Sequence, residues 1–172
     1  MIISLTGFMG IGKSTISEQL SKQLYCKSID LDKYIEFNEG LSVDEIFRSK
    51  GEPYFRKKEE YYLNKLLTEN REKVLVVSMG GGTLMSRLNQ ELIKEKTFCI
   101  YLKASPGTQL DRLSKSQKAR PNIEGLSADE FEKGIKSLFE VRREGYEYSS
   151  SLIIDVDSKS IKDILTEIIN SI

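Results

Sequence analysis

The segment GFMGIGKST, residues 7–15, has the spacing G-x-x-x-x-G-K-[ST] of a phosphate-binding loop. It lies between an apolar run and an amphipathic stretch, as that motif requires. Its glycines let backbone N–H groups and the N-terminus of the next helix point at an anion. Lys13 would reach the outer phosphates of a nucleotide, and Ser14 would ligate Mg²⁺. A glycine-rich turn without a ligand is the alternative, which the lysine, the hydroxyl and the context together disfavour.

Two acids, Asp30 and Asp32, stand in SIDLDKYIE, residues 28–36, one helix after this loop. The chain contains no histidine, so a carboxylate is the natural candidate for accepting a proton. Two neighbouring carboxylates stay ionised only with positive charge nearby, which Mg²⁺ and Lys13 could supply. Alone, such a pair is more typical of a surface turn or a helix cap, but its position favours a functional role.

The loop predicts a nucleotide and leaves the acceptor of a phosphoryl group open. A regulatory GTPase would need an N-K-x-D motif, and NKLL at 64–67 lacks the aspartate. Motor and DNA-acting ATPases are usually larger. Small-molecule kinases are the class that remains.

Short β-rich runs alternate with helical stretches. The predicted strands are residues 1–6, 73–78, 97–103 and 151–156, with a shorter one around 28–29. Near-continuous apolar strands separated by helices indicate an α/β fold with a parallel sheet covered on both faces.

Helix signals fill the intervals between these strands. A helix should begin near Lys13, with Ile16, Leu20 and Leu24 on its buried face. Capping boxes predict two further helix starts, and the apolar spacing in 160–172 predicts a closing helix. The two boxes are Ser42 with Glu45 and Ser127 with Glu130.

At 172 residues we expect one domain, and 26 basic against 26 acidic residues give no net field toward nucleic acid or an anionic membrane. Cys26 and Cys99 form no metal or disulfide pattern, and no run approaches the ~20 apolar residues of a membrane span. We therefore expect a cytoplasmic protein, with Cys99 in the core. A monomer is the default, because no exposed apolar helix face stands out.

Five motifs occur in one order along the chain. They are DLD at 30–32, GEPYFRKKE at 51–59, GGG at 80–82, ARP at 119–121 and RREGY at 142–146. With the phosphate loop, this ordered set resembles the shikimate kinase family over essentially the whole chain. The resemblance implies Mg²⁺-dependent transfer of the ATP γ-phosphoryl group to the 3-hydroxyl of shikimate, in chorismate and aromatic amino acid biosynthesis. It also implies a three-layer α/β/α sandwich with a five-stranded parallel sheet, like the nucleoside monophosphate kinases.

The resemblance divides residues 1–172, a single kinase domain, into functional parts. The loop at 7–15 would bind phosphate, the region near 32–62 shikimate, and the polar segment near 114–125 would be a mobile lid. Asp30 and Ser14 would hold Mg²⁺, while Asp32 would bond the shikimate hydroxyls and act with Lys13 and Arg120 in catalysis. Contacts to ATP would come from Gly10, Ile11, Gly12, Lys13, Ser14, Thr15, Arg112 and Arg120.

The same resemblance assigns Arg56 and Arg142 to the shikimate carboxylate, which suits a planar guanidinium. Arg143 is the rival, and spacing to Tyr146 favours Arg142. The backbone of Gly80, Gly81 and Gly82 would approach the shikimate ring. Met79 stands where the family often has a small hydroxyl residue, which puts a hydroxyl contact to Mg²⁺ from this strand in doubt.

On the nucleotide side, Arg112 would stack on adenine, and residues 155–160 would form the far wall of that pocket. Arg120 would swing in against the phosphates when the lid closes. Without the resemblance, the segment near 114–125 would be read as a solvated loop.

Two alternatives stay open. Gluconate or nucleoside monophosphate kinases share the loop and lid, but not the joint set of Asp32, Arg56, the triple glycine and Arg142. A non-catalytic ATP-binding regulatory domain would have no need to keep every catalytic charge.

Overall fold

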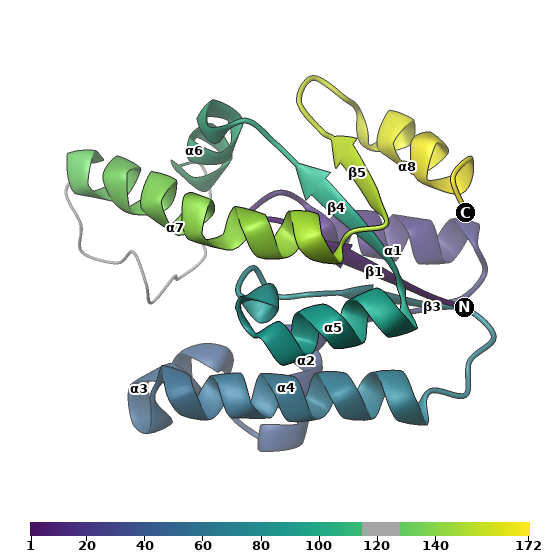
Figure 1. Cartoon of the computed structure of the whole chain (residues 1–172), viewed down its shortest axis with the longest axis horizontal. Coiled ribbons are helices and arrows are strands. Elements are labelled where there is room, and N and C mark those ends of the chain that lie inside the picture. The colour runs from purple at the N-terminus through teal and green to yellow at the C-terminus, as the bar shows by residue number, and fades with distance from the viewer. Residues whose placement is uncertain (115–127) are drawn as a thin grey trace.

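Five strands form one sheet in the computed structural model, which describes residues 1–114 and 128–172. The strands β1 (Ile2–Thr6), β2 (Lys27–Asp30), β3 (Leu75–Ser78), β4 (Phe98–Lys103) and β5 (Leu152–Asp155) lie in the order β2-β3-β1-β4-β5. All neighbouring pairs are parallel, so the carboxyl ends of the strands meet at one edge (Figure 1). The predicted five-stranded α/β fold is confirmed: four strands fall on the predicted apolar runs, and β2 falls at the shorter strand predicted around 28–29.

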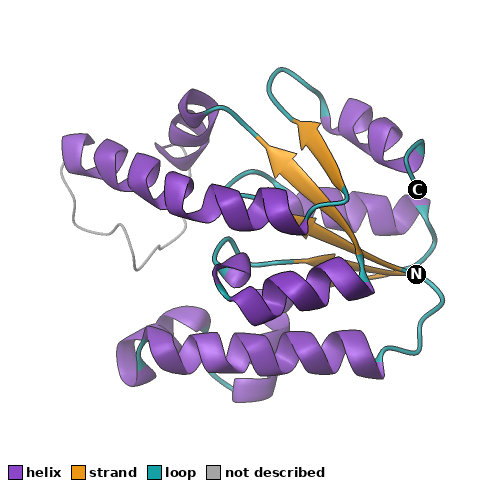
Figure 2. Cartoon of the chain, viewed as in Figure 1, coloured by secondary structure: helices purple, strands orange, loops and turns teal. Residues whose placement is uncertain are grey.

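Helices connect the strands and enclose them (Figure 2). They are α1 (Lys13–Gln23), α2 (Leu31–Glu39), α3 (Val43–Lys50), α4 (Glu52–Glu69), α5 (Arg87–Lys96), α6 (Pro106–Ser114), α7 (Ala128–Ser149) and α8 (Ile161–Ile169), with a 3₁₀ turn η1 (Thr83–Met85). The helix predicted near Lys13 and the closing helix are α1 and α8. Among the described helices, none is both long and apolar enough to cross a membrane.

Alternation along the strands divides the core into two layers, because successive side chains point to opposite faces of a sheet. Val76 and Ile100 pack with α1 and α8, whereas Val77 and Tyr101 pack with α2, α4, α5 and α7. Cys99 lies fully buried in the second layer, as predicted, and both cysteines are free. The three-layer arrangement follows from this two-residue period.

Local capping fixes the helix starts beside the sheet edge. Ser42 and Glu45 form the predicted capping box of α3. The second predicted box cannot be compared in full, because Ser127 lies outside the described residues. Asp30 ends β2 and caps α2, accepting a hydrogen bond from the Lys33 backbone N–H at 3.3 Å. Asp32 therefore lies in the first turn of α2 and shares no strand face with Asp30.

Candidate active site

The phosphate loop runs from the end of β1 into α1, with Gly12 as the helix N-cap. The ammonium of Lys13 donates to the carbonyl oxygens of Gly7 and Phe8, both at 2.9 Å. These bonds hold the lysine inside the loop, where its side chain is buried. The loop thus places a cation and the N-terminus of α1 at one point, an arrangement that attracts phosphate.

Oxygen ligands suited to Mg²⁺ lie beside this loop. The hydroxyl of Ser14 donates to Oδ2 of Asp30 at 2.7 Å. Within the described residues, no group of three or more acidic, cysteine or histidine side chains could hold a metal by itself. A hydroxyl and one carboxylate fit Mg²⁺, which is usually held by one or two carboxylates together with waters and substrate phosphates.

Asp32 is surrounded by charges of both signs. Burial raises the pKa of its carboxyl to about 7, and the negative charges of Glu59 and Asp30 act in the same direction. Lys13 and Arg56 oppose this shift without cancelling it. A carboxylate with a pKa near neutrality can both accept and release a proton at physiological pH.

Arg56, on α4, is held by two acids of its own helix. Its Nη1 donates to Oε2 of Glu59 at 2.7 Å, and its Nη2 donates to Oε1 of Glu52 at 2.9 Å. Glu59 is buried and accepts a second hydrogen bond from the Thr83 hydroxyl at 2.6 Å. Burial disfavours the charged form of Arg56, but the two acids outweigh it, so its pKa lies above its ordinary value.

Arg142, on α7, has a different environment. It is 5% exposed, and within residues 1–114 and 128–172 it forms no ion pair with an acid. Its guanidinium carbon lies 5.7 Å from the ring centre of Phe8, and its Nε is buried without a hydrogen-bond partner in this part of the chain. Burial lowers the pKa of Arg142. Arg143, its rival, is exposed and pairs with Glu140 at 3.3 Å.

The triple glycine after β3 touches all three of these side chains. A Cβ atom on Gly80 would lie 2.8 Å from Oδ1 of Asp32, and one on Gly82 would lie 2.5 Å from Nη2 of Arg56. A Cβ atom on Gly81 would lie 3.2 Å from Nη1 of Arg142. Real Cβ atoms essentially never come within 3.0 Å of another atom, so glycine at 80 and 82 leaves room for Asp32 and Arg56, while a Cβ atom at 81 would make a tight contact with Arg142.

A cavity of ≈ 440 Å³ opens beside this turn. Both arginines line it, and Met85 and Leu138 supply apolar wall. A concave site with apolar walls and a few convergent charged groups is typical of small-molecule binding. Glu52 and Glu60 also line the cavity, and Glu52 pairs with Arg56, so Arg142 is the guanidinium best placed to bind an anionic ligand there.

A second set of contacts fixes α2, which carries Asp32, against α4, which carries Arg56. Glu39 at the end of α2 accepts hydrogen bonds from Tyr54 at 2.7 Å and Tyr62 at 2.9 Å, and pairs with Lys58 at 2.8 Å. The hydrogen bond from Lys58 is the largest of the effects that lower the pKa of Glu39 to about 2. These contacts fix the position of α2 relative to α4.

On the nucleotide side, Arg112 of α6 reaches the phosphate loop. Its Nη1 donates to the carbonyl oxygen of Ile11 at 2.8 Å. The loop after β5 lies beside the start of α6, because Asp157 accepts a hydrogen bond from the Ser105 N–H at 3.0 Å. Arg120 and the predicted lid, apart from Ser114, lie outside the described residues, so their roles stay predictions.

Comparison with known proteins decides the family. A family model described as shikimate kinase matches residues 9–172. The chain belongs to the shikimate kinase family. A shikimate kinase of Alkaliphilus oremlandii is 38% identical over 172 residues, covering 99% of this chain and 98% of that protein.

Solved shikimate kinases have the same fold. The structure from Bacteroides thetaiotaomicron gives a TM-score of 0.89 at 28% identity, covering 99% of this chain and 97% of that one. The structure from Acinetobacter baumannii, in complex with shikimate, gives 0.87 at 27% identity, covering 99% and 91%. The resemblance carried by the five motifs is confirmed.

Several residues of this candidate site were not predicted. Glu59 ends the motif GEPYFRKKE and stands three residues after Arg56, a spacing that pairs side chains on a helix and could have drawn attention to it. Thr83 and Phe8 carry no comparable signal. Met79, in place of a hydroxyl residue, is buried in the core and offers no oxygen to a metal.

Proposed function

We propose that this chain transfers the γ-phosphoryl group of ATP to the 3-hydroxyl of shikimate, giving 3-phosphoshikimate and ADP. The observation that carries the proposal is the glycine turn, where Asp32, Arg56 and Arg142 converge beside a phosphate loop. Shikimate is a small carboxylate with three hydroxyls, and this set matches both kinds of group. Family membership, which covers residues 9–172, supports the same activity.

The shikimate carboxylate would lie against Arg142 and Arg56. A buried guanidinium without an acid beside it in the described residues is costly in the free protein, so an incoming carboxylate gains much of its favourable energy there. The planar guanidinium can bond both carboxylate oxygens. Arg56, already held by Glu52 and Glu59, would contribute a fixed donor direction more than uncompensated charge.

Asp32 would orient the 3-hydroxyl and accept its proton on a carboxylate oxygen. A pKa of about 7 suits this task, because the group is half ionised at neutral pH and can release the proton afterwards. Phosphoryl transfer usually passes through a loose transition state, so the hydrogen bond that positions the hydroxyl matters more than strong basicity.

The nucleotide would occupy the loop from Gly10 to Thr15, with Lys13 leaving the loop carbonyls to bond the outer phosphates. Ser14 and Asp30 would hold Mg²⁺, which when bound neutralises phosphate charge. Arg112 would stack on adenine. The sequence also predicts that Arg120→Ala strongly lowers turnover with a smaller effect on ATP binding, which single-turnover kinetics would check.

The experiment that tests this function measures ADP production by the purified chain with ATP and Mg²⁺. Shikimate, gluconate and nucleoside monophosphates are supplied as separate acceptors, with ATP alone as the background. We expect ADP release to depend on shikimate. Turnover with a different acceptor only would overturn the substrate assignment. ATP binding without any turnover would favour a regulatory domain.

The proposal concerns one chain acting alone. A monomer in the cytoplasm remains our prediction, and sedimentation of the purified chain would test the first part of it.

A further inference from the structure

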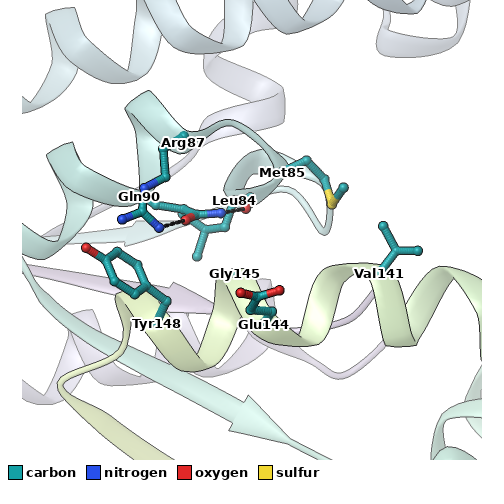
Figure 3. Close-up of a pocket in the computed structure, with 8 residues that line it drawn as sticks. All are labelled: Leu84, Met85, Arg87, Gln90, Val141, Glu144, Gly145 and Tyr148. Atoms are coloured by element: carbon teal, nitrogen blue, oxygen red, sulfur yellow. Dashed lines mark hydrogen bonds between the residues drawn. The ribbon is translucent and has the colours of Figure 1, made fainter.

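Helix α7 crosses η1 in direct backbone contact at Gly145. A Cβ atom on Gly145 would overlap the carbonyl oxygen of Leu84 and lie 3.0 Å from Nε2 of Gln90. Figure 3 shows α7 at Gly145 running beneath Leu84 and Gln90. Glycine is otherwise unfavourable inside a helix compared with alanine, so its presence in α7 calls for a packing reason.

The η1 side of this crossing is held firmly in place. The Leu84 carbonyl accepts a hydrogen bond from Nε2 of Gln90 at 2.8 Å, and the Thr83 carbonyl accepts one from Nδ2 of Asn89 at 2.9 Å. The Thr83 hydroxyl is bonded to Glu59. Since three side chains from α4 and α5 fix η1, a larger residue at 145 would displace α7.

The α7 side of the crossing carries Arg142, a residue proposed to bind the substrate, and Tyr146. Tyr146, the next residue, donates a hydrogen bond from its hydroxyl to the carbonyl oxygen of Gly81. Arg142 lies one turn before it and approaches the same glycine. The separation of α7 from η1 therefore sets how far the Arg142 guanidinium reaches over the glycine turn.

We propose that Gly145 is a positioning residue for the acceptor carboxylate. By letting α7 contact the η1 backbone, it places Arg142 in the same cavity as Arg56, which α4 and Glu59 hold independently. This inference rests on the proposed function and names the packing contact on which acceptor affinity depends.

The test is Gly145→Ala, compared with Gly107→Ala. Gly107 also lies in a helix, and a Cβ atom there would meet no atom within 4 Å. For Gly145→Ala we expect shikimate affinity, measured by calorimetry, to fall by about tenfold, because overpacking a tight contact moves the backbone. The KM for ATP should stay within about twofold, and Gly107→Ala should match the wild type in shikimate affinity.

A double variant separates positioning from general destabilisation. In an Arg142→Ala background, Gly145→Ala should have little further effect on kcat/KM for shikimate, since the group it misplaces is already absent. An additive loss would overturn the proposal. So would unchanged shikimate affinity in Gly145→Ala with an equal or higher melting temperature, the result that helix propensity alone predicts.

Two further measurements keep the inference open to refutation. If Gly145→Ala does not fold, Tyr146→Phe removes the hydrogen bond to Gly81 without adding volume, and it should weaken shikimate binding while sparing ATP. Unchanged shikimate binding in Tyr146→Phe would count against the proposal.

If the wild type does not phosphorylate shikimate, the proposed function fails by itself. A crystal structure of Gly145→Ala then decides, because Arg142 left in place would refute the inference.

Discussion

Arg56 and Arg142 line the same cavity, yet the protein treats their charges in opposite ways. Arg56 has two acids in contact, and its pKa lies above its ordinary value because those acids outweigh burial. Arg142 is buried on α7 against Phe8, has no acid partner in the described chain, and its pKa is lowered by burial. The charge of Arg56 is therefore compensated in the free protein, whereas the charge of Arg142 is not compensated by an acid in the described chain.

This difference assigns different tasks to two residues of one type. A guanidinium already paired with acids gains little electrostatic energy from a ligand. It contributes mainly the direction of its hydrogen bonds and the shape of the cavity. A buried guanidinium without a counter-charge favours whatever carboxylate can reach it, and it disfavours neutral ligands. We therefore propose that Arg56 on α4 selects the ligand by geometry and Arg142 on α7 selects it by charge.

The largest effect should come from removing the uncompensated charge. Arg142→Ala should lower kcat/KM for shikimate by roughly 100- to 1,000-fold, since losing a buried charged contact costs about 3–4 kcal/mol. The KM for ATP should barely change. Steady-state kinetics with each substrate varied in turn would measure this. If Arg142→Lys and Arg142→Ala both kept most of the activity, the contrast between the two arginines would be wrong.

Asp32→Asn should lower turnover by about 100-fold while ATP binding survives, because the variant can still bond a hydroxyl but cannot take its proton. Since the pKa of Asp32 is about 7, wild-type kcat/KM for shikimate should rise with pH through that value, and the variant should lack this limb. A loss of nucleotide affinity like that expected for Lys13→Ala would speak against the assignment.

The same raised pKa has a consequence for stability. The folded protein binds more protons than the unfolded chain between the ordinary value of 3.8 and about 7, so the free energy of unfolding falls as pH rises through this window. Above it, Asp32→Asn should melt at a higher temperature than the wild type. Calorimetric melting of both proteins at pH 5 and pH 8 would check the sign, and a variant that melts below the wild type at pH 8 would refute it.

Alanine substitutions in the glycine turn should displace the two arginines to different extents. A Cβ atom on Gly82 would come within 2.5 Å of Arg56, whereas one on Gly81 would stay 3.2 Å from Arg142. We therefore expect Gly82→Ala to weaken shikimate binding by roughly tenfold and Gly81→Ala by less. Calorimetric titration would measure both, and the reverse order would contradict the geometry of the turn.

The smallest predicted effect distinguishes the acids that hold Arg56. Glu59→Gln removes a charge that raises the pKa of Asp32, so the pH limb of kcat/KM should move to lower pH. Glu52→Gln is the matched control, since Glu52 also pairs with Arg56 but is not among the main contributors to the raised pKa of Asp32. If the pH dependence of kcat/KM shifted equally in Glu59→Gln and Glu52→Gln, the distinction between the two acids would be wrong.

The sheet and the phosphate loop could be predicted because their signals are local. Apolar runs, a G-x-x-x-x-G-K-[ST] spacing and a capping box act within about ten residues. The spacing of Glu59 to Arg56 indicates an ion pair, but the importance of that pair could not be predicted, because Glu59 looks like any acid in a lysine-rich helix until its burial is known. Its partner Thr83 comes from a different segment of the chain.

Arg142 and Arg143 illustrate the same limit. Adjacent residues on a helix point about 100° apart, so one is buried and the other solvated, but periodicity in this charged stretch does not say which. Family spacing to Tyr146 chose Arg142, and the structure buries that residue. Gly145 lies in the motif RREGY at 142–146, but its role in packing could not be predicted, since its contact with η1 depends on how two distant elements cross.

The most direct test of the account is a crystal structure of this chain with shikimate and ADP. We predict that the carboxylate of shikimate contacts the guanidinium groups of both Arg142 and Arg56, with a ring hydroxyl at the Asp32 carboxylate. A carboxylate bound elsewhere, with Arg142 still lacking an anionic partner, would contradict the central claim that this arginine is the charge-selecting group.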